Sequence, residues 1–452
     1  MTDAAAPIAA EPAAPTESRK HITVVGAAFL GIGSMVGAGI FALLGQAAVV
    51  AGPAVWLSFL LAGVTTFLLA YNVVKLGIRY PSSGGLIEYL LQGFGNGRLL
   101  GVAAWLGYFA AFVIVAAMVA VSFGAYAVSL FGTAGSAWDN VFTSALIVGM
   151  AAINMLGTQF VARVASFMVV VLLAVFSVFI VVTITDLDLD LLAFSTYPSF
   201  ADIIASIALT FFAFLGFGVM TFAVGSLRNP ARELPRAMVI ALGLTTATYV
   251  LIAVGVFGTL TVDEAIGYGE TAIAEAARPA LGDAGFTIMA IAALLATAGA
   301  TNATLFGSNS LATTLADLRQ FPPIFGRGSR LGANGGLLIT TALVLVIANV
   351  VDLSAIASVG SACSLMVFLL VGIAGLRLRS ETGASTWIVL VGLAVTVVVL
   401  GFFAVDTLQN SPETFSAMIG IAALAVAIDF IWKRMRPPEP AAAVASEPTL
   451  SP

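Results

Sequence analysis

Residues 31–41 read Gly31-Ile32-Gly33-Ser34-Met35-Val36-Gly37-Ala38-Gly39-Ile40-Phe41 and lie in the first long apolar run of the chain. Four of these residues are glycine. In the interior of a helix, each glycine costs roughly 1 kcal/mol relative to alanine. The run therefore predicts a helix that is locally unstable at these glycines. Whether such a helix can be interrupted there depends on the surrounding solvent, which the composition identifies.

The 452-residue chain is 60% hydrophobic and only 9% charged, with a mean hydropathy of +1.08. Ordinary soluble domains carry about 25% charged residues, so this chain cannot cover a water-facing surface. We expect an integral membrane protein that has the lipid bilayer as a partner. The single cysteine and the single histidine argue against disulfides and a histidine metal site, and the net charge of −5 argues against a nucleic-acid partner.

Twelve apolar stretches of the sequence have the roughly 20 residues that a helix needs to cross a bilayer. They do not alternate in polarity as the strands of a membrane barrel do. We therefore predict an all-α membrane protein with twelve transmembrane helices. The predicted spans are 22–49, 54–74, 99–131, 140–158, 164–185, 203–226, 237–260, 284–316, 333–351, 354–376, 386–405 and 414–432.

Basic residues favour the cytoplasmic side of a membrane. With the N-terminus inside and one crossing per span, every basic residue except Arg278 falls on the inner side, whereas the outer loops are acidic. This partition predicts a protein of the cell membrane with both termini cytoplasmic. Residues 19–436 then form the transmembrane domain. Residues 1–18 and 437–452 have too few large apolar residues to fold, and we expect disordered cytoplasmic tails there.

Charged side chains are nearly absent from the predicted spans, where only Asp429 occurs, near the end of the last one. Intramembrane charges usually mark ion or proton pathways. Inside the bilayer, a polar or charged ligand must therefore be bound by backbone groups, hydroxyls and amides. Because the spans offer no acid, base or metal cluster, we expect neither enzyme activity nor a resident metal or cofactor.

The sixth run holds a second glycine-interrupted segment, Phe211-Phe212-Ala213-Phe214-Leu215-Gly216-Phe217-Gly218. In lipid, a helix can be interrupted only where the freed N–H and C=O groups are buried in protein or line a cavity. Interruptions in the first and sixth helices indicate a five-plus-five inverted repeat with a substrate site between them. An alternative interpretation is that glycines such as Gly33 and Gly37 only let helices pack closely.

Interrupted helices also predict the chemistry of the substrate. The N-terminal end of a half-helix offers N–H donors and a positive dipole end, which suit a carboxylate. The opposite end offers free carbonyls, which suit an ammonium group or a small cation. A zwitterionic amino acid fits such a site without any charged side chain.

Several motifs are similar to those of the amino acid–polyamine–organocation transporters. The segment from Gly33 to Phe41 resembles their first-helix signature. Phe211 to Phe217, followed by Leu227-Arg-Asn-Pro-Ala-Arg-Glu-Leu-Pro-Arg-Ala237, resembles their sixth helix and the loop after it. The resemblance implies a leucine-transporter-like fold with alternating-access transport. In that fold the first ten helices form the two inverted repeats, and the last two helices are appended.

The resemblance also implies substrate contacts. N–H groups of the first helix would meet the substrate carboxylate, and carbonyls of the sixth would meet its amine. Two phenylalanines would form an aromatic lid, for which plain core packing is the alternative. The N–H groups belong to Val36, Gly37, Ala38 and Gly39, the carbonyls to Phe212, Ala213 and Leu215, the lid rings to Phe212 and Phe214, and further pocket candidates are Tyr108 and Phe112.

The chain departs from the family pattern where relatives carry charge. Relatives often have acidic residues at the positions of Gly218, Gly225 and Ser226, so the departure argues against cationic amino acids and polyamines. Proton-coupled relatives can carry a lysine in helix five, where the matching position here is Leu172. That route for a coupling proton is therefore absent.

Coupling stays open between sodium, another proton route and no coupling ion. Sodium-coupled proteins of this fold use carbonyls of helix one and hydroxyls of helix eight, and neutral oxygens suit hard cations. Hydroxyls and amides in membrane helices also often bond only to their own backbone. The matching candidates for a sodium site are Gly33, Val36, Ala298, Thr301 and Asn302.

We predict a secondary transporter, or permease, that moves a small neutral or zwitterionic amino acid or a close analogue across the membrane by alternating access. The main alternative is an inorganic cation or a small amine carried by the same fold. A receptor or subunit that does not transport is a second alternative. Symport, antiport and uniport, and the oligomeric state, stay open at this point.

Overall fold

The computed structural model of the protein describes residues 22–81, 85–95, 97–132, 136–156, 161–326 and 334–435. Regular structure within these ranges is helical throughout, as the sequence predicts. The predicted tails lie outside them. In chain order the elements are α1 (Val24–Ala38), α2 (Ile40–Ala51), η1 (Gly52–Ala54), α3 (Val55–Arg79), α4 (Leu86–Phe94), α5 (Arg98–Tyr108), η2 (Phe109–Ile114), α6 (Val115–Phe131), α7 (Ser136–Leu156), α8 (Val161–Thr185), η3 (Phe194–Thr196), α9 (Phe200–Phe212), η4 (Leu215–Ser226), α10 (Pro230–Phe257), α11 (Val262–Tyr268), η5 (Gly269–Thr271), α12 (Ala272–Glu275), α13 (Arg278–Asp317), η6 (Pro323–Phe325), α14 (Gly335–Val350), α15 (Leu353–Arg377), α16 (Arg379–Thr382), α17 (Thr386–Asn410) and α18 (Pro412–Met435).

Every predicted span corresponds to one helix or to consecutive helices of the structure. Nine helical segments in the described residues are long and apolar enough to cross a membrane, and the shorter apolar helices Val24–Gly37 and Gly335–Val350 accompany them. One reason why these segments are fewer than the twelve predicted spans is that η1 leads α2 directly into α3, so that Ile40–Arg79 forms one apolar segment. The number of membrane crossings therefore stays a prediction.

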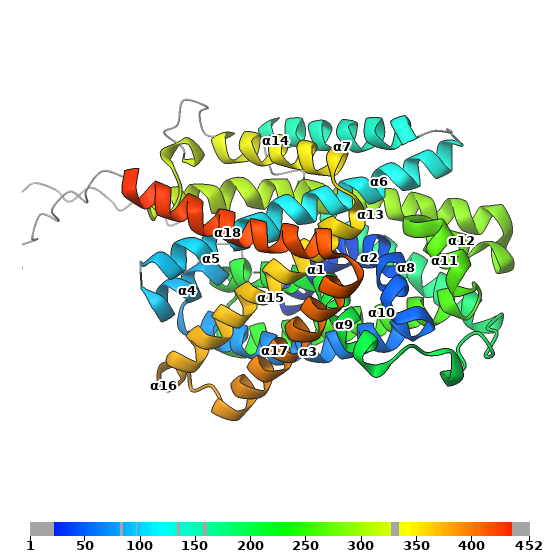
Figure 1. The fold of residues 1–452 in the computed structure, drawn as a ribbon, viewed down its shortest axis with the longest axis horizontal. Helices are drawn as coiled ribbons and strands as arrows, with labels where there is room; N and C mark the ends of the chain where they lie inside the picture. The colour runs from blue at the N-terminus through cyan, green and yellow to red at the C-terminus, as the bar shows by residue number, and fades with distance from the viewer. Residues whose placement is uncertain are drawn as a thin grey trace, which may run out of the picture.

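The helices that carry the two predicted interruptions lie in the middle of the molecule (Figure 1). α1 packs against η4, α10 and α13, and α9 packs against α2 and α3. Burial follows this arrangement, because 78% of the most apolar window of Phe200–Ser226 is buried, compared with 17% for Pro412–Met435. Other helices therefore shield the interrupted backbone from lipid, as its freed polar groups require.

Short helices that the sequence did not predict fill the connections between the long ones. α11 and α12 lie together at one end of the molecule, whereas α4 and α16 lie toward the other (Figure 1). α11 begins at a reciprocal cap, in which the Glu264 carboxylate accepts from the Thr261 N–H at 2.9 Å and the Thr261 hydroxyl accepts from the Glu264 N–H at 3.3 Å. Hydrogen bonds from Thr261 also lower the pKa of Glu264.

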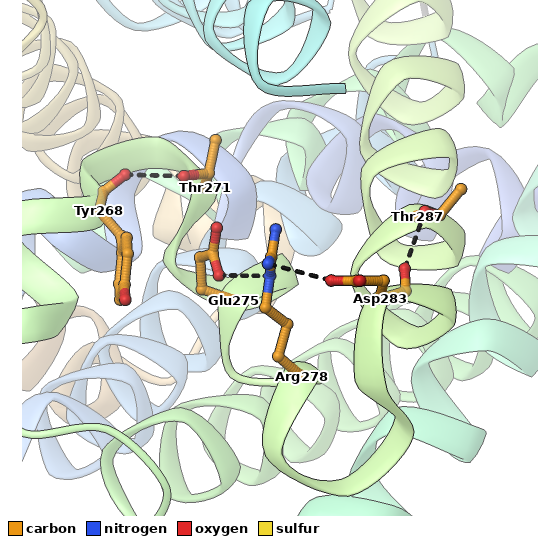
Figure 2. Close-up of polar contacts among 6 residues, drawn as sticks. All are labelled: Tyr268, Thr271, Glu275, Arg278, Asp283 and Thr287. Atoms are coloured by element: carbon orange, nitrogen blue, oxygen red, sulfur yellow. Dashed lines mark hydrogen bonds and ion pairs between the residues drawn. The ribbon is translucent and has the colours of Figure 1, made fainter. Parts of the chain in front are cut away.

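The start of α13 contains a bend at Gly282, where φ is +61° and ψ is −157°. Arg278 spans this bend, with its guanidinium 2.7 Å from the Glu275 carboxylate and 3.1 Å from that of Asp283 (Figure 2). The guanidinium also lies over the Phe286 ring, 4.4 Å from its centre. Arg278 is the one basic residue that the sequence assigns to the outer side, and these acidic neighbours balance its charge there.

Candidate functional site

The first interruption is one residue wide and lies at Gly39. This residue has φ −97° and ψ −73°, away from the helical values of about −63° and −42°. Its N–H donates to the Met35 carbonyl at 2.9 Å, and its carbonyl accepts from the Leu43 N–H at 3.1 Å. Val36 and Ala38 belong to the last turn of α1. Since a helix leaves its last carbonyls and first N–H groups without partners inside it, α1 presents carbonyls here and α2 presents donors.

The other glycines of this stretch are contact points. Gly31, Gly33 and Gly37 all lie within α1. A Cβ at Gly37 would lie 2.8 Å from the Ala296 carbonyl oxygen and 2.8 Å from the Ala300 Cβ on α13, closer than real Cβ atoms approach. The glycine-rich stretch therefore combines close packing at three glycines with an interruption at the fourth.

The second interruption is longer. α9 ends at Phe212, a turn follows, and the chain continues as the 3₁₀-helix η4. The Phe214 N–H donates to the Phe211 carbonyl at 2.9 Å, and the Phe217 N–H donates to the Phe214 carbonyl at 3.0 Å. Runs of 3₁₀-helix beyond about 4 residues are uncommon and often mark a hinge or strain, and η4 has 12 residues. The sequence predicted the interruption but not the change of helix type.

The two interruptions touch through main-chain atoms. A Cβ at Gly216, in the first turn of η4, would lie 2.4 Å from both the Met35 nitrogen and the Ser34 carbonyl carbon. A Cβ at Gly39 would lie 2.7 Å from the Ala213 carbonyl oxygen. Because only a residue without Cβ permits these approaches, the backbone of the sixth helix lies directly on that of the first.

The two predicted lid residues point toward different helices. Phe212 lies against α15, where a Cβ at Gly360 would come within 2.5 Å of its ring. Phe214 is fully buried and packs against Tyr249 of α10, with ring centres 5.2 Å apart. Leu215 is partly buried beside the core. The structure therefore brings the predicted binding backbone together but directs the two rings to separate neighbours.

Helix three contributes a feature that the sequence did not reveal. Phe109–Ile114 forms a π-helix between α5 and α6, and such segments are frequent at functional sites. Tyr108 hydrogen-bonds to the Thr340 hydroxyl, and Phe112 packs against Gly307 of α13. No residue pattern marks a π-segment, so the two aromatic side chains were the only signal available.

α13 meets the first helix through Ala296 and Ala300, the two residues that contact Gly37. An α-helix has about 3.6 residues per turn. Ala298 and Asn302, two residues of the predicted ion site, therefore lie on roughly the opposite face of α13.

Three of the ion-site candidates already have other contacts. The Asn302 Oδ1 accepts from Asn154 Nδ2 of α7 at 2.8 Å, and the Thr301 hydroxyl donates to the Thr297 carbonyl at 2.9 Å. Gly33 lies against the Val169 side chain of α8. The structure thus keeps α1 and α13 adjacent without gathering all the candidates around one point, and the sodium site stays a prediction.

Two cavities open elsewhere on the described structure. One of about 440 Å³ lies beside the end of α2, with Gly52, Asp190 and Thr261 in its lining. The other, of about 240 Å³, lies between α8 and α13 and has an apolar lining. At the interruptions themselves, Phe212 and Ala213 are only 2% and 1% exposed. The candidate site is therefore closed to solvent in this structure.

The chemistry that the site offers is that of peptide dipoles. The candidate binding residues carry no charged side chain, and Asp429, in the last helix, is paired with Lys433 at 2.8 Å. Within the described ranges, no group of three or more His, Cys, Asp or Glu side chains is placed to hold a metal ion. Carbonyls at the ends of α1 and α9 and N–H groups at the start of α2 can instead receive the two charges of a zwitterion.

Two discontinuous helices that meet in the centre of a helical membrane fold are a feature of secondary transporters. The fold and the site thus define a multi-pass membrane transporter with a leucine-transporter-like fold. By its sequence, the chain belongs to the amino acid permease family, whose family model matches residues 22–428.

Individual relatives and solved structures agree with this assignment. The chain is 33% identical to the inner membrane transport protein YbaT of Escherichia coli (strain K12), over 90% of this chain and 94% of that protein. It is 27% identical to the serine/threonine exchanger SteT of Bacillus subtilis (strain 168), over 67% of this chain and 70% of that protein. A crystal structure of a manganese transporter mutant from Eremococcus coleocola shares the fold, with a TM-score of 0.60 and 13% identity over 91% and 94% of the chains. The predicted family and fold class are confirmed.

Proposed function

We propose that the protein transports a small neutral or zwitterionic amino acid, or a close analogue, by alternating access. The observation that carries this proposal is the main-chain contact between the two interruptions, where Gly216 lies on Met35 and Gly39 lies on Ala213. Donors and acceptors of opposite polarity meet there without a charged side chain. Membership in the amino acid permease family and the likeness to a serine/threonine exchanger support this substrate class.

In this proposal the substrate lies between the two interruptions. Its carboxylate approaches the interruption at Gly39 from the side of α2, whose first N–H groups are free and where the helix dipole is positive. Its ammonium group approaches the carbonyls of Phe212, Ala213 and Leu215. Phe212 closes over the substrate, whereas Phe214 stays packed against Tyr249 of α10.

The alternative substrate is an inorganic cation. The fold likeness to a manganese transporter favours it, and free carbonyls suit hard cations. Manganese prefers carboxylate, carbonyl and water oxygens, and the site residues supply only the carbonyls. The amino acid is therefore the better match, because it uses the N–H donors of α2 as well.

Uptake into proteoliposomes tests the substrate class. Purified protein is reconstituted and screened with radiolabelled small neutral amino acids, with and without a sodium or proton gradient. We expect saturable uptake of at least one of them, which unlabelled amino acid competes away and manganese does not. Manganese uptake without any amino acid uptake would replace the proposal by its alternative. The imposed gradients would identify a coupling ion.

A further inference from the structure

Tyr249 lies on α10, a helix that has no interruption of its own, yet its hydroxyl reaches the site. The side chain is fully buried. Its hydroxyl donates to the Ala213 carbonyl oxygen at 3.3 Å. Ala213 directly follows the last residue of α9, so the tyrosine holds a carbonyl that the interruption has freed.

The ring of Tyr249 is fixed on two sides. Phe59 of α3 packs against it with ring centres 5.3 Å apart, and Phe214 packs against it with ring centres 5.2 Å apart. A ring held between two others cannot turn its hydroxyl away without displacing them. The direction of the Ala213 carbonyl is therefore set by a helix outside the interrupted pair.

The first helix meets this hydrogen bond at Gly39. A Cβ at Gly39 would lie 2.6 Å from the Tyr249 hydroxyl oxygen and 2.7 Å from the Ala213 carbonyl oxygen. The hydroxyl, the carbonyl and the interrupted residue of α1 therefore meet at one point. That point is where the two interruptions face each other.

A carbonyl oxygen has two lone pairs, and a phenol hydroxyl is both a donor and an acceptor. Tyr249 uses one lone pair of the Ala213 carbonyl and leaves the other. Its own oxygen can also accept. At 3.3 Å the hydrogen bond is longer than the usual range for a hydroxyl donor, which runs to about 3.0 Å. An arriving cationic donor therefore meets a carbonyl that Tyr249 contacts but binds only weakly.

We propose that Tyr249 is a positioning residue for the substrate's ammonium group. By holding the Ala213 carbonyl in place, it aims the free lone pair of that carbonyl at the ammonium group and has no part in binding the carboxylate. This inference rests on the proposed amino acid substrate and names the side chain that orients one end of it.

The test compares ligands that lack one charged group each. L-Alanine, L-serine and L-threonine serve as amino acids, their deaminated acids (propanoate, 3-hydroxypropanoate and 3-hydroxybutanoate) lack the ammonium group, and their amides lack the carboxylate. Binding to purified protein is measured for each, for the unaltered chain and for Tyr249→Phe. This substitution removes the hydroxyl and keeps the ring between its two neighbours.

We expect Tyr249→Phe to weaken the binding of the amino acids and of the amides by about tenfold. The affinity for the deaminated acids should change by less than about twofold. The matched control is Tyr126→Phe on α6. Tyr126 is equally buried, and its hydroxyl has no hydrogen-bond partner among the described residues, so all its affinities should stay unchanged. Melting temperatures of both variants report whether each protein is folded.

Two different results separate the two levels of the proposal. Equal weakening of all three ligand classes by Tyr249→Phe, or no weakening, would show that the hydroxyl has only a structural role and would overturn the inference. Failure of the unaltered protein to bind any of the three amino acids would instead overturn the proposed function for small neutral amino acids.

Discussion

Gly37 sets the distance between two helices by the side chain that it lacks. Its Cα faces the Ala296 carbonyl and the Ala300 side chain so closely that even a methyl group would overlap both. Replacing Gly37 with leucine should abolish transport, because α1 and α13 can no longer approach each other beside the site. Insertion into the membrane should persist, since the substitution makes the span more apolar.

The control for this prediction is Gly401→Leu on α17, where nothing lies within 4 Å of an added Cβ. Uptake by the control should match that of the unaltered protein. Normal uptake by Gly37→Leu, at a similar amount of protein in the membrane, would refute the close approach of α1 and α13 as a requirement for transport.

Glu270 on η5 tests the electrostatics of the loop between α10 and α13. Burial raises the pKa of this carboxyl, and the nearby Asp139 carboxylate raises it further. A raised pKa means that the folded state prefers the protonated form, so its contribution to stability is present below the ordinary pKa of a carboxyl and is lost as the pH rises through the folded value. Glu270→Gln should therefore raise the melting temperature at pH 7.

This gain should shrink as the pH falls and vanish well below the ordinary glutamate pKa of about 4.3, where the native glutamate is protonated in both states. Glu264→Gln provides the comparison of opposite sign. Hydrogen bonds from Thr261 lower the pKa of Glu264, so its substitution should lower the melting temperature at pH 7 and matter less as the pH falls. A lower melting temperature of Glu270→Gln at pH 7 would contradict the assigned cause of its pKa shift.

At the scale of elements, the sequence predicted the places of the interruptions better than their form. Gly39 and Gly216 were within reach of sequence reasoning because a run of glycines weakens a helix wherever it occurs. The 3₁₀ form of η4 could not be predicted from the sequence, because the type of helix there depends on packing against α1. Tyr249 was missed as well, since one aromatic residue in an apolar run looks like ordinary core packing.

The bend at the start of α13 is a second property of an element that can be tested alone. Gly282 has φ +61° and ψ −157°, a region that is almost restricted to glycine, where another residue costs about 1–3 kcal/mol. Gly282→Ala should therefore lower the stability of the protein by about that amount. Thermal unfolding in detergent or nanodiscs measures the change.

Gly267→Ala on α11 is the matched variant. An added Cβ meets nothing within 4 Å at either glycine, and Gly267 has no positive φ. Alanine should stabilise α11 there by up to about 1 kcal/mol, so the two substitutions should act in opposite directions. Equal effects of both would show that the backbone of α13 is not strained at Gly282.

At the scale of the whole molecule, composition and span positions predicted the fold class because lipid allows few solutions for a chain so poor in charge. The contacts between helices were less predictable. Asn302 matches a sodium-site position of the family, yet its amide pairs with Asn154 of α7. The sequence carries no record of which neighbouring helix a side chain faces.

The orientation that the basic residues predict has a direct test. Cys363, the single native cysteine, is buried, so introduced cysteines can be labelled selectively. Asp263 on α11 and Ser385 before α17 are both exposed. We expect a membrane-impermeant maleimide to label Asp263→Cys in intact cells and Ser385→Cys only after the cells are opened. The reverse pattern would place both termini outside.

The central claim is that freed peptide groups at two helix interruptions hold the substrate. The most direct measurement is an experimental structure of the protein with a transported amino acid bound. The account predicts the carboxylate within hydrogen-bond distance, about 3 Å, of N–H groups where α1 gives way to α2, and the ammonium group at the same distance from carbonyls of residues 212–215. An amino acid bound instead in the cavity beside the end of α2, with the two interruptions still packed against each other, would contradict it.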